Sequence, residues 1–386
     1  MIDVARLRRE TPGAERVCHL NNAGSALPPQ ASLEAVVAHL ELEAAIGGYE
    51  AGAMRAAEIE AVYGSIGRLI GAARDELAFS ENATRAWDMA FYGLRFGPGD
   101  RIITGMAEYA SNAIAMLQVA ARTGARLEIC PDDESGQLDV AALERMLDDR
   151  VRLIAVVHAP TQGGLLNPAA AVGRVARAAG IPYLLDACQS LGQLPVDVNE
   201  IGCDMLSATG RKFLRGPRGT GFLYVRRSLI GELEPPMLDL HAAEWTAADR
   251  YETQPDARRF ETWERSYACM LGLGAAIDYA LEIGIAEIGE RARGLAARLR
   301  VALAEHPRAT PLDRGAELSA IVTFRLRDEA PAATADRLRA AGVNVSVSRL
   351  PSARYDLGAR GIDALVRASP HAYNTEAEID RLLELL

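Results

Sequence analysis

The chain has 386 residues and a formal net charge of −10, with 49% hydrophobic and 24% charged residues. This balance is typical of a globular protein and argues against a disordered chain, while the acidic charge argues against binding to nucleic acid. No apolar run reaches the roughly 18 residues that span a bilayer, and the N-terminal residues lack the apolar core of a signal peptide, so we expect a cytoplasmic protein without membrane partners.

Short apolar runs alternate with helical patterns through the first two thirds of the chain. The apolar runs predict strands over 101–104, 126–130, 153–158, 183–186, 205–208 and 221–225. The segments between them include predicted helices over 111–123, 140–149 and 169–179. Strands separated by helices of this length predict right-handed crossovers and a mostly parallel sheet.

The pattern changes after about residue 265. A long helical pattern over 267–305 contains Gly272, Gly274 and Gly284, and it is followed by predicted strands over 320–325, 343–348 and 364–369 and helices over 332–341 and 375–386. We expect a large α/β domain over 21–265 and a small C-terminal α+β domain over 266–386. Residues 1–20 are expected to pack on the small domain.

The basic residues are distributed unusually, because the chain has a single lysine, Lys212, against 41 arginines. Arginine does not lose its proton at useful pH, whereas a lysine amine can become a nucleophile. Chance in an arginine-rich sequence would also leave one lysine. The five cysteines form no CxxC pair, which predicts reduced thiols and no metal site.

Polar residues follow two neighbouring predicted strands. Asp186 ends one of them, and Lys212 follows the next by a few residues, just before a turn rich in glycine. Ligands bind at the carboxyl ends of strands in open α/β sheets, although an aspartate there also serves as a turn or capping residue. A lysine amine beside an acid that partners a ring nitrogen is the arrangement that pyridoxal phosphate requires.

With these motifs, the sequence resembles the class V aminotransferase family, the fold-type I pyridoxal phosphate enzymes that include cysteine desulfurases. The resemblance covers nearly the whole chain through HLNNAGSALPP (19–29), SENATRAW (80–87), LLDACQSLGQ (184–193), SATGRKFLRGPRGTGFLYV (207–225) and VRASPHAYNTEAEID (366–380). It implies a mostly parallel, seven-stranded sheet between helices in the large domain. It also implies pyridoxal 5′-phosphate as cofactor and a homodimer with shared active sites.

The resemblance assigns roles to individual residues. For the cofactor, it implies Lys212 as the catalytic lysine that forms the aldimine, Asp186 at the ring nitrogen, Gln189 at the ring oxygen, and Ala83, Thr84, Thr209 and Thr262 at the phosphate. Tyr109 and Arg211 stand where relatives often have histidines. We expect Tyr109 to stack on the ring, and Arg211 to bind the phosphate rather than form a surface ion pair. Thr262 would reach the phosphate of the neighbouring subunit. For an amino-acid substrate, it implies Arg367 at the α-carboxylate, with Asn22, His158 and His371 as further candidates.

Two departures from the family pattern bear on the reaction. Tyr109 stands where relatives often have a histidine, so it can stack on the ring but cannot act as an imidazole acid or base. Residues 346–364, which carry the nucleophilic cysteine in desulfurases, contain no cysteine. A persulfide-forming desulfurase is therefore disfavoured.

We expect a carbon–sulfur lyase that acts by β-elimination on a cysteine S-conjugate or a related sulfur amino acid. An aminotransferase and an amino-acid epimerase or racemase remain alternatives, since all of these reactions begin by removing the Cα proton. A binding module that has lost its chemistry is disfavoured by the presence of Lys212, Asp186, Gln189 and Arg367.

Overall fold

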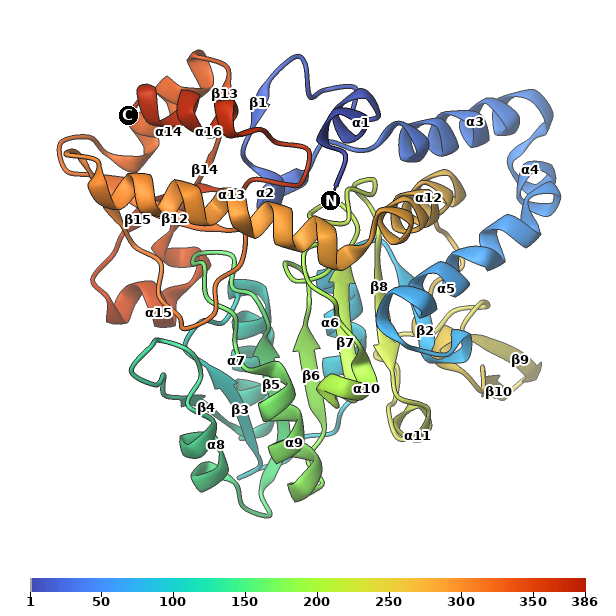
Figure 1. Cartoon of the computed structure of the whole chain (residues 1–386). Helices are drawn as coiled ribbons and strands as arrows, with labels where there is room; N and C mark the ends of the chain where they lie inside the picture. Colours follow the sequence, from blue (N-terminus) through green and yellow to red (C-terminus); the bar gives the residue numbers. More distant parts are fainter. Residues whose placement is uncertain (1) are drawn as a thin grey trace.

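The computed structural model describes residues 2–386, and its largest element is a seven-stranded sheet in the order β2-β8-β7-β6-β5-β3-β4 (Figure 1). The strands are β2 (Leu77–Ser80), β3 (Arg101–Gly105), β4 (Arg126–Cys130), β5 (Val151–Val157), β6 (Tyr183–Asp186), β7 (Met205–Thr209) and β8 (Gly221–Val225). Only β8 runs antiparallel to its neighbours. The predicted mostly parallel α/β sheet is confirmed.

Helices cover both faces of this sheet. The side chains of Ile102, Leu153 and Leu184 pack with α6 (Ala83–Phe91) and α7 (Ala110–Thr123) on one face. The following residues in each strand pack on the other face, with α5 (Ala56–Ile70), α8 (Val140–Met146), α9 (Ala169–Ala179) and α12 (Tyr267–Ile283). This burial on both sides explains why the strands appear in the sequence as continuous apolar runs. Short helices α10 (Val198–Ile201), α11 (Arg227–Ile230), η1 (Arg74–Glu76) and η2 (Ala257–Phe260) complete this part.

The C-terminal part is built on a four-stranded antiparallel sheet in the order β11-β12-β15-β14. Its strands are β11 (Ala309–Pro311), β12 (Val322–Leu326), β14 (Ser346–Arg349) and β15 (Ala364–Ala368). Its helices are α13 (Ile285–Glu305), α14 (Pro331–Ala340), η3 (Leu350–Ser352), α15 (Arg354–Ala359) and α16 (Glu376–Glu384). The strand expected over 343–348 is divided at Val345, because β13 (Val343–Asn344) pairs with a different strand, β1.

The N-terminal segment runs along the C-terminal part before it enters the large domain. It contains α1 (Val4–Arg9), β1 (Cys18–His19), α2 (Asn22–Ser25), α3 (Gln30–Ile46) and α4 (Gly48–Met54). β1 pairs in parallel with β13, and Asn21 forms a further bridge to Ser369. The N-terminal segment and the C-terminal part therefore lie side by side above the large sheet (Figure 1).

The helical pattern over 267–305 is broken at Gly284, and α12 and α13 meet there at 82°. Gly284 has a φ of +100°, and an added Cβ would lie 2.0 Å from Glu287 Oε2, so the bend requires glycine. Among residues 2–386, no single helix is long and apolar enough to cross a membrane, and α12 with α13 meets that test only as a bent pair.

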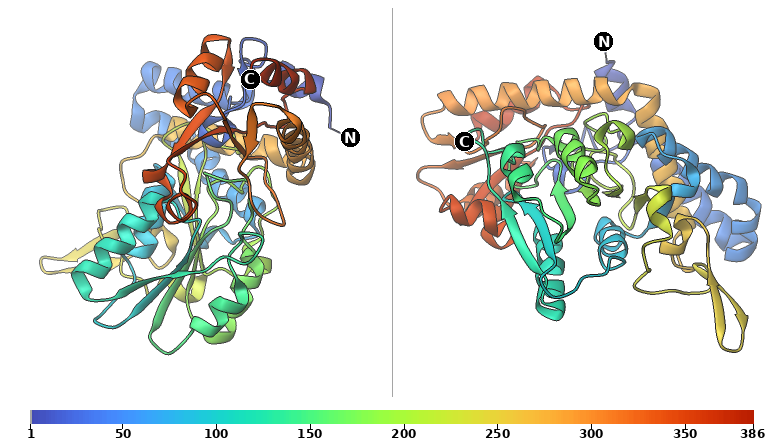
Figure 2. Two further views of the ribbon diagram at one scale, coloured as in Figure 1. Left: turned by 90° about the vertical axis from the view of Figure 1, so that its left-hand side faces the viewer. Right: turned by 90° about the horizontal axis from the view of Figure 1, so that it is seen from below.

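A two-stranded hairpin of β9 (Ala243–Ala247) and β10 (Arg250–Thr253) projects from the large domain (Figure 2). It was not expected from the sequence, because most of its side chains are exposed and its residues show no apolar alternation.

Candidate active site

A cavity of about 510 Å³ opens at the carboxyl edge of the large sheet. The residues in its wall follow β5, β6 and β7 or precede α6 and α7: Asn82, Ala83, Thr84, Tyr109, Val157, Ala159, Thr161, Asp186, Cys188, Gln189, Thr209, Arg211 and Lys212. Eight of the predicted site residues lie together in this wall, including the single lysine.

Lys212 is held by the loop that follows β7. Gly210 N–H donates to Thr220 O at 3.0 Å, and Gly216 N–H donates to Gly210 O at 2.8 Å. A Cβ at Gly210 would lie 2.2 Å from Thr220 Oγ1, so only glycine fits here. Burial lowers the pKa of the Lys212 amine, which favours the neutral, nucleophilic form.

Asp186 ends β6, next to Val157 on one side and Ser207 on the other. Its Oδ1 accepts the backbone N–H of Cys188 at 2.9 Å, and its Oδ2 accepts Asn112 Nδ2 at 3.0 Å. These two bonds fix the carboxylate in the cavity wall.

Gln189 lies in the loop that follows β6, three residues after Asp186. Its Nε2 donates to Ala23 O at 2.9 Å and to Thr161 Oγ1 at 3.0 Å. Its Oε1 is buried and has no hydrogen-bond partner within residues 2–386. A buried polar atom without a partner costs free energy, and the cavity is the place where a ligand can satisfy it.

The opposite end of the cavity combines groups that bind anions. Ala83 and Thr84 start α6, where free backbone N–H groups and the helix dipole favour negative charge. Gly221 allows the close approach of β8, since a Cβ there would lie 3.0 Å from Ala83 N. Thr209 supplies a hydroxyl, and Arg211 supplies a half-buried guanidinium that also donates to Gly24 O.

Tyr109 is the residue directly before α7, and its side chain is 36% exposed in the cavity wall. Its backbone N–H donates to the carboxyl group of Glu108 at 2.6 Å. The ring position agrees with the stacking role implied by the resemblance.

Arg367 comes from β15 of the small sheet and reaches the cavity through Thr161. Its Nη1 donates to Thr161 O at 3.1 Å and to Thr161 Oγ1 at 2.5 Å, and its Nη2 donates to Asn21 Oδ1 at 3.2 Å. Its Nε has no partner among the residues described. Burial, with a smaller effect of Arg211, lowers the pKa of Arg367 to about 10. A buried guanidinium with neutral partners is suited to receive a carboxylate.

None of the four predicted substrate residues is in the wall of this cavity, and only Arg367 has a side chain that bonds to a residue of the wall, Thr161. His158 lies in a separate hollow with Arg293 and Glu317, whereas its chain neighbours Val157 and Ala159 line the cavity, because adjacent side chains point in opposite directions. Burial lowers the pKa of His158 to about 4. Asn22 is also elsewhere: its amide bonds to Ser369 O at 2.8 Å and accepts Tyr373 Oη at 2.6 Å. The neighbouring Asn21, not Asn22, contacts Arg367.

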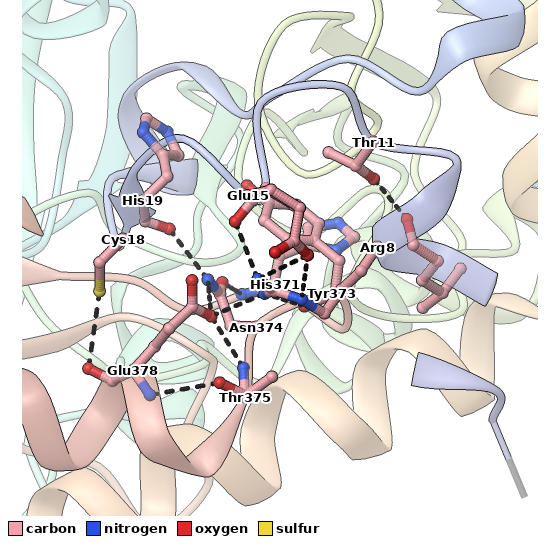
Figure 3. Close-up of polar contacts among 12 residues, drawn as sticks. Arg8, Thr11, Glu15, Cys18, His19, His371, Tyr373, Asn374, Thr375 and Glu378 are labelled. Carbon is pink, nitrogen blue, oxygen red and sulfur yellow. Dashed lines mark hydrogen bonds and ion pairs between the residues drawn. The ribbon is translucent and has the colours of Figure 1, made fainter. Parts of the chain in front are cut away.

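His371 belongs to the contact between the two ends of the chain, which Figure 3 shows. It bonds to Phe213 O at 3.0 Å, stacks against Phe213 and Tyr373, and lines none of the cavity around Lys212. Thr262 also lies outside this cavity, and its hydroxyl donates to Glu81 Oε1 at 3.3 Å. Its implied role toward a neighbouring subunit is not tested by a single chain.

Sequence reasoning missed three residues that shape the site: Thr161, Asn112 and Asn21. Thr161 joins Gln189 to Arg367, and Asn112 supports Asp186. Thr161 is three residues from the end of a predicted strand, and that position was the only available signal for it. Asn112 is the second residue of a predicted helix, and nothing in its local sequence indicates its contact with Asp186.

The residues present fit pyridoxal 5′-phosphate. An amine, a fixed carboxylate, an unpaired buried amide oxygen and a helix start with a hydroxyl and a guanidinium surround one cavity. Lys212 would hold the aldehyde carbon, Asp186 the ring nitrogen, and Ala83, Thr84, Thr209 and Arg211 the phosphate.

Residues 18–382 match the family described as aminotransferase class V, and the chain belongs to that family. A probable cysteine desulfurase from Methanothermobacter thermautotrophicus is 32% identical, over 82% of this chain and 80% of the relative. A probable cysteine desulfurase from Synechocystis is 30% identical, over 100% of this chain and 93% of the relative. The solved cysteine desulfurase from Thermococcus onnurineus has a TM-score of 0.92 at 25% identity, over 100% of this chain and 97% of that chain.

The protein is therefore a fold-type I, pyridoxal 5′-phosphate-dependent enzyme of class V, and the predicted family, fold class and cofactor are confirmed.

Proposed function

We propose that the protein is a carbon–sulfur lyase that breaks the Cβ–S bond of a cysteine S-conjugate or a related sulfur amino acid by β-elimination. One observation carries this proposal: a buried amine lines the cavity, the buried guanidinium of Arg367 bonds to the cavity residue Thr161, and the one thiol in the cavity wall is poorly suited to attack sulfur. When bound, pyridoxal 5′-phosphate supplies an electron sink for the charge that develops at the substrate Cα.

Three side chains prepare the substrate. Arg367 binds the α-carboxylate with its fork of N–H groups, and Thr161 holds the guanidinium in place from the opposite side. The Lys212 amine is kept neutral by burial, so Nζ can take the proton from Cα. As that C–H bond breaks, its electron pair forms the Cα–Cβ double bond, and the Cβ–S pair leaves with sulfur.

This reaction needs no thiol from the protein. Residues 346–364 contain no cysteine, and among the cavity residues only Cys188 carries a thiol. Burial, reinforced by Asp186, raises the pKa of Cys188 well above its ordinary value, so this thiol stays protonated and is a weak nucleophile. We therefore favour elimination over transfer of sulfur to an enzyme cysteine.

A persulfide-forming cysteine desulfurase is the second candidate, because the curated relatives carry that name. In that reaction, sulfur moves to a thiol and the rest of cysteine becomes alanine. Cys188 would have to be the acceptor in the cavity. An aminotransferase has less support, since the relatives named above act on sulfur amino acids.

The products distinguish these reactions. The cofactor-loaded enzyme is incubated with S-substituted cysteines and with L-cysteine, and pyruvate, ammonia and alanine are measured without an added keto acid. We expect catalytic pyruvate and ammonia in equal amounts. Alanine as the main product would establish a desulfurase, and conversion of the cofactor to its amine form with no pyruvate would establish an aminotransferase.

Two variants serve as controls. Lys212→Ala should abolish product formation, by about 10³-fold or more, because no other amine lies in the cavity wall. Cys188→Ser should keep at least half of the pyruvate-forming activity. Loss of activity in Cys188→Ser with normal cofactor content would support the desulfurase.

We also infer that the enzyme is a homodimer. Tyr49 and Met54 on α4 are 79% and 67% exposed, and Tyr49 lines a second hollow with Trp263, directly beside Thr262. Large exposed apolar side chains of this kind are typical of protein interfaces. Light scattering should give twice the chain mass, and a fully active monomer would contradict the inference.

A further inference from the structure

A buried acid, Glu108, lies beside the cofactor residues, and the proposed mechanism does not use it. Glu108 is 3% exposed and precedes α7 by two positions. Its carboxyl group contacts Thr104 Oγ1 at 2.5 Å, Tyr109 N at 2.6 Å and Asn112 Nδ2 at 2.9 Å. The group is therefore fixed on every side by short hydrogen bonds.

The amide of Asn112 joins this acid to Asp186. Asn112 Nδ2 lies 2.9 Å from Glu108 Oε1 and 3.0 Å from Asp186 Oδ2. An amide nitrogen has two hydrogens, so it donates to both carboxyl groups at once. Of the three residues that this acid contacts, Tyr109 lines the cavity and Asn112 bonds to the cavity residue Asp186.

The surroundings of Glu108 shift its pKa. Burial, together with the nearby Asp186, raises the pKa of Glu108 to about 7, against the opposing effect of its hydrogen bonds. All three bonds are donated to this carboxyl group: Thr104 Oγ1 donates to Oε2, and the Tyr109 N–H and Asn112 Nδ2 donate to Oε1. The titratable groups that face it are Asp186 on β6 and Tyr355 on α15.

We propose that Glu108 is a positioning residue for the cofactor: its carboxyl group orients Asn112, which holds the Asp186 carboxyl group ready for the ring nitrogen. The inference rests on the proposed function only for its cofactor and is independent of the bond that the enzyme breaks. A purely structural role for Glu108, as an acid at a helix start, would leave the spectrum of the bound cofactor unchanged.

The test compares four cofactor-loaded proteins: wild type, Glu108→Gln, Asn112→Asp and Glu128→Gln. Glutamine keeps the shape of Glu108 and cannot ionise. Aspartate keeps the shape of Asn112 but has a carboxylate oxygen in place of the amide nitrogen. The group between Glu108 and Asp186 is then a hydrogen-bond acceptor and can no longer donate to both. Glu128 pairs with Arg101 at the far edge of the sheet, so its variant is a matched control for loss of a carboxylate.

Two readouts are measured, the visible absorbance of the bound cofactor across a pH range centred on about 7 and the dissociation constant of the cofactor. Wild type and Glu128→Gln should share an inflection near pH 7 that Glu108→Gln lacks. Asn112→Asp should bind the cofactor about tenfold to a hundredfold more weakly, because Asp186 loses a charge-assisted hydrogen bond.

Superimposable titrations for wild type and Glu108→Gln would overturn the proposal, as would unchanged cofactor affinity in Asn112→Asp. If one variant does not fold, the other decides by the same criteria. Products are not measured, so an enzyme that forms alanine instead of pyruvate would overturn the proposed function and leave this result unaffected.

Discussion

Two arginines are equally buried in this protein and have opposite surroundings. Arg367 is 7% exposed and Arg215 is 4% exposed, and neither forms an ion pair within residues 2–386. Arg367 bonds to the cavity residue Thr161 and to Asn21, so its partners are a hydroxyl, a carbonyl and an amide, and its Nε has no partner among residues 2–386. A buried cation of this kind has both charge and hydrogen-bonding capacity to offer a ligand.

Arg215 has no such capacity. Its Nε donates to Leu27 O at 2.9 Å, its Nη2 donates to Thr11 Oγ1 at 2.5 Å, and its guanidinium lies 4.8 Å from the centre of the Tyr373 ring. It also has a φ of 62°, which is unusual for a residue with a side chain. The comparison teaches that burial alone does not identify a binding cation. What distinguishes Arg367 from Arg215 is that its Nε is buried without a partner among residues 2–386 and that it bonds to a residue of the cavity wall.

Arg367→Lys should give the largest effect. A lysine keeps the charge but loses the two-pronged geometry, so kcat/KM for an amino-acid substrate should fall by about 10²–10³-fold with little change in melting temperature. Steady-state kinetics measures this. A substrate analogue without the α-carboxylate is the control, since wild type and variant should process it equally. A similar loss with that analogue would show that Arg367 does not bind the carboxylate.

Arg215→Ala should instead lower the free energy of unfolding, by about 3 kcal/mol, because two hydrogen bonds and an aromatic contact are lost. KM should stay within about threefold of wild type. Arg215→Gly should be about 1 kcal/mol more stable than Arg215→Ala, because glycine adopts a positive φ without strain. Denaturant unfolding measures both, and a variant with normal stability and raised KM would reverse the assignments of the two arginines.

His371, which packs beside Arg215, should make stability depend on pH. Burial, assisted by Arg215, lowers the pKa of His371 to about 3, whereas an unfolded histidine titrates near about 6.5. The unfolded state therefore binds the extra proton as pH falls through about 6.5, and at pH of about 5 this costs roughly 2 kcal/mol of stability. Thermal unfolding of His371→Asn should show a shallower loss of melting temperature in acid than wild type, with His306→Asn as control. An unchanged slope would contradict the assignment.

Thr161→Val should have the smallest effect. Valine keeps the shape but removes the hydroxyl that Gln189 and Arg367 share, so KM should rise about tenfold while kcat changes little. Thr161→Ser, which keeps the hydroxyl, should restore the wild-type KM. An equal loss in both variants would mean that the methyl group, not the hydroxyl, matters.

Much of the fold could be predicted because each strand and helix is indicated by the pattern of apolar residues within its own segment. The strands β4, β6 and β8 have the bounds that their apolar runs predict. The three glycines of the long helical pattern could not be told apart: Gly284 breaks it through its φ, whereas a Cβ at Gly272 would lie 2.5 Å from Val36 Cγ2, so that glycine serves close packing. The difference depends on the partner helix, which a single sequence does not contain.

The site residues likewise divide into those with a local signal in the sequence and those without one. Lys212, Asp186 and Gln189 were predicted because they stand in short motifs next to strand ends. Thr161 was missed because its contact with Arg367 joins residues 206 positions apart. Asn21 and Asn22 are adjacent and identical in type, so only the direction of each side chain separates the one that contacts Arg367 from the one that is buried among backbone groups.

The contact between Asn21 and Arg367 also spans 346 positions of the chain. At about 5–20 residues per second, a ribosome makes these two residues roughly twenty seconds to more than a minute apart. Lys212 and Asp186 can be in place long before Arg367 emerges. During synthesis, the residues proposed to bind the cofactor are therefore made well before Arg367. An unfinished chain can then bind the cofactor before it can bind the α-carboxylate of an amino acid.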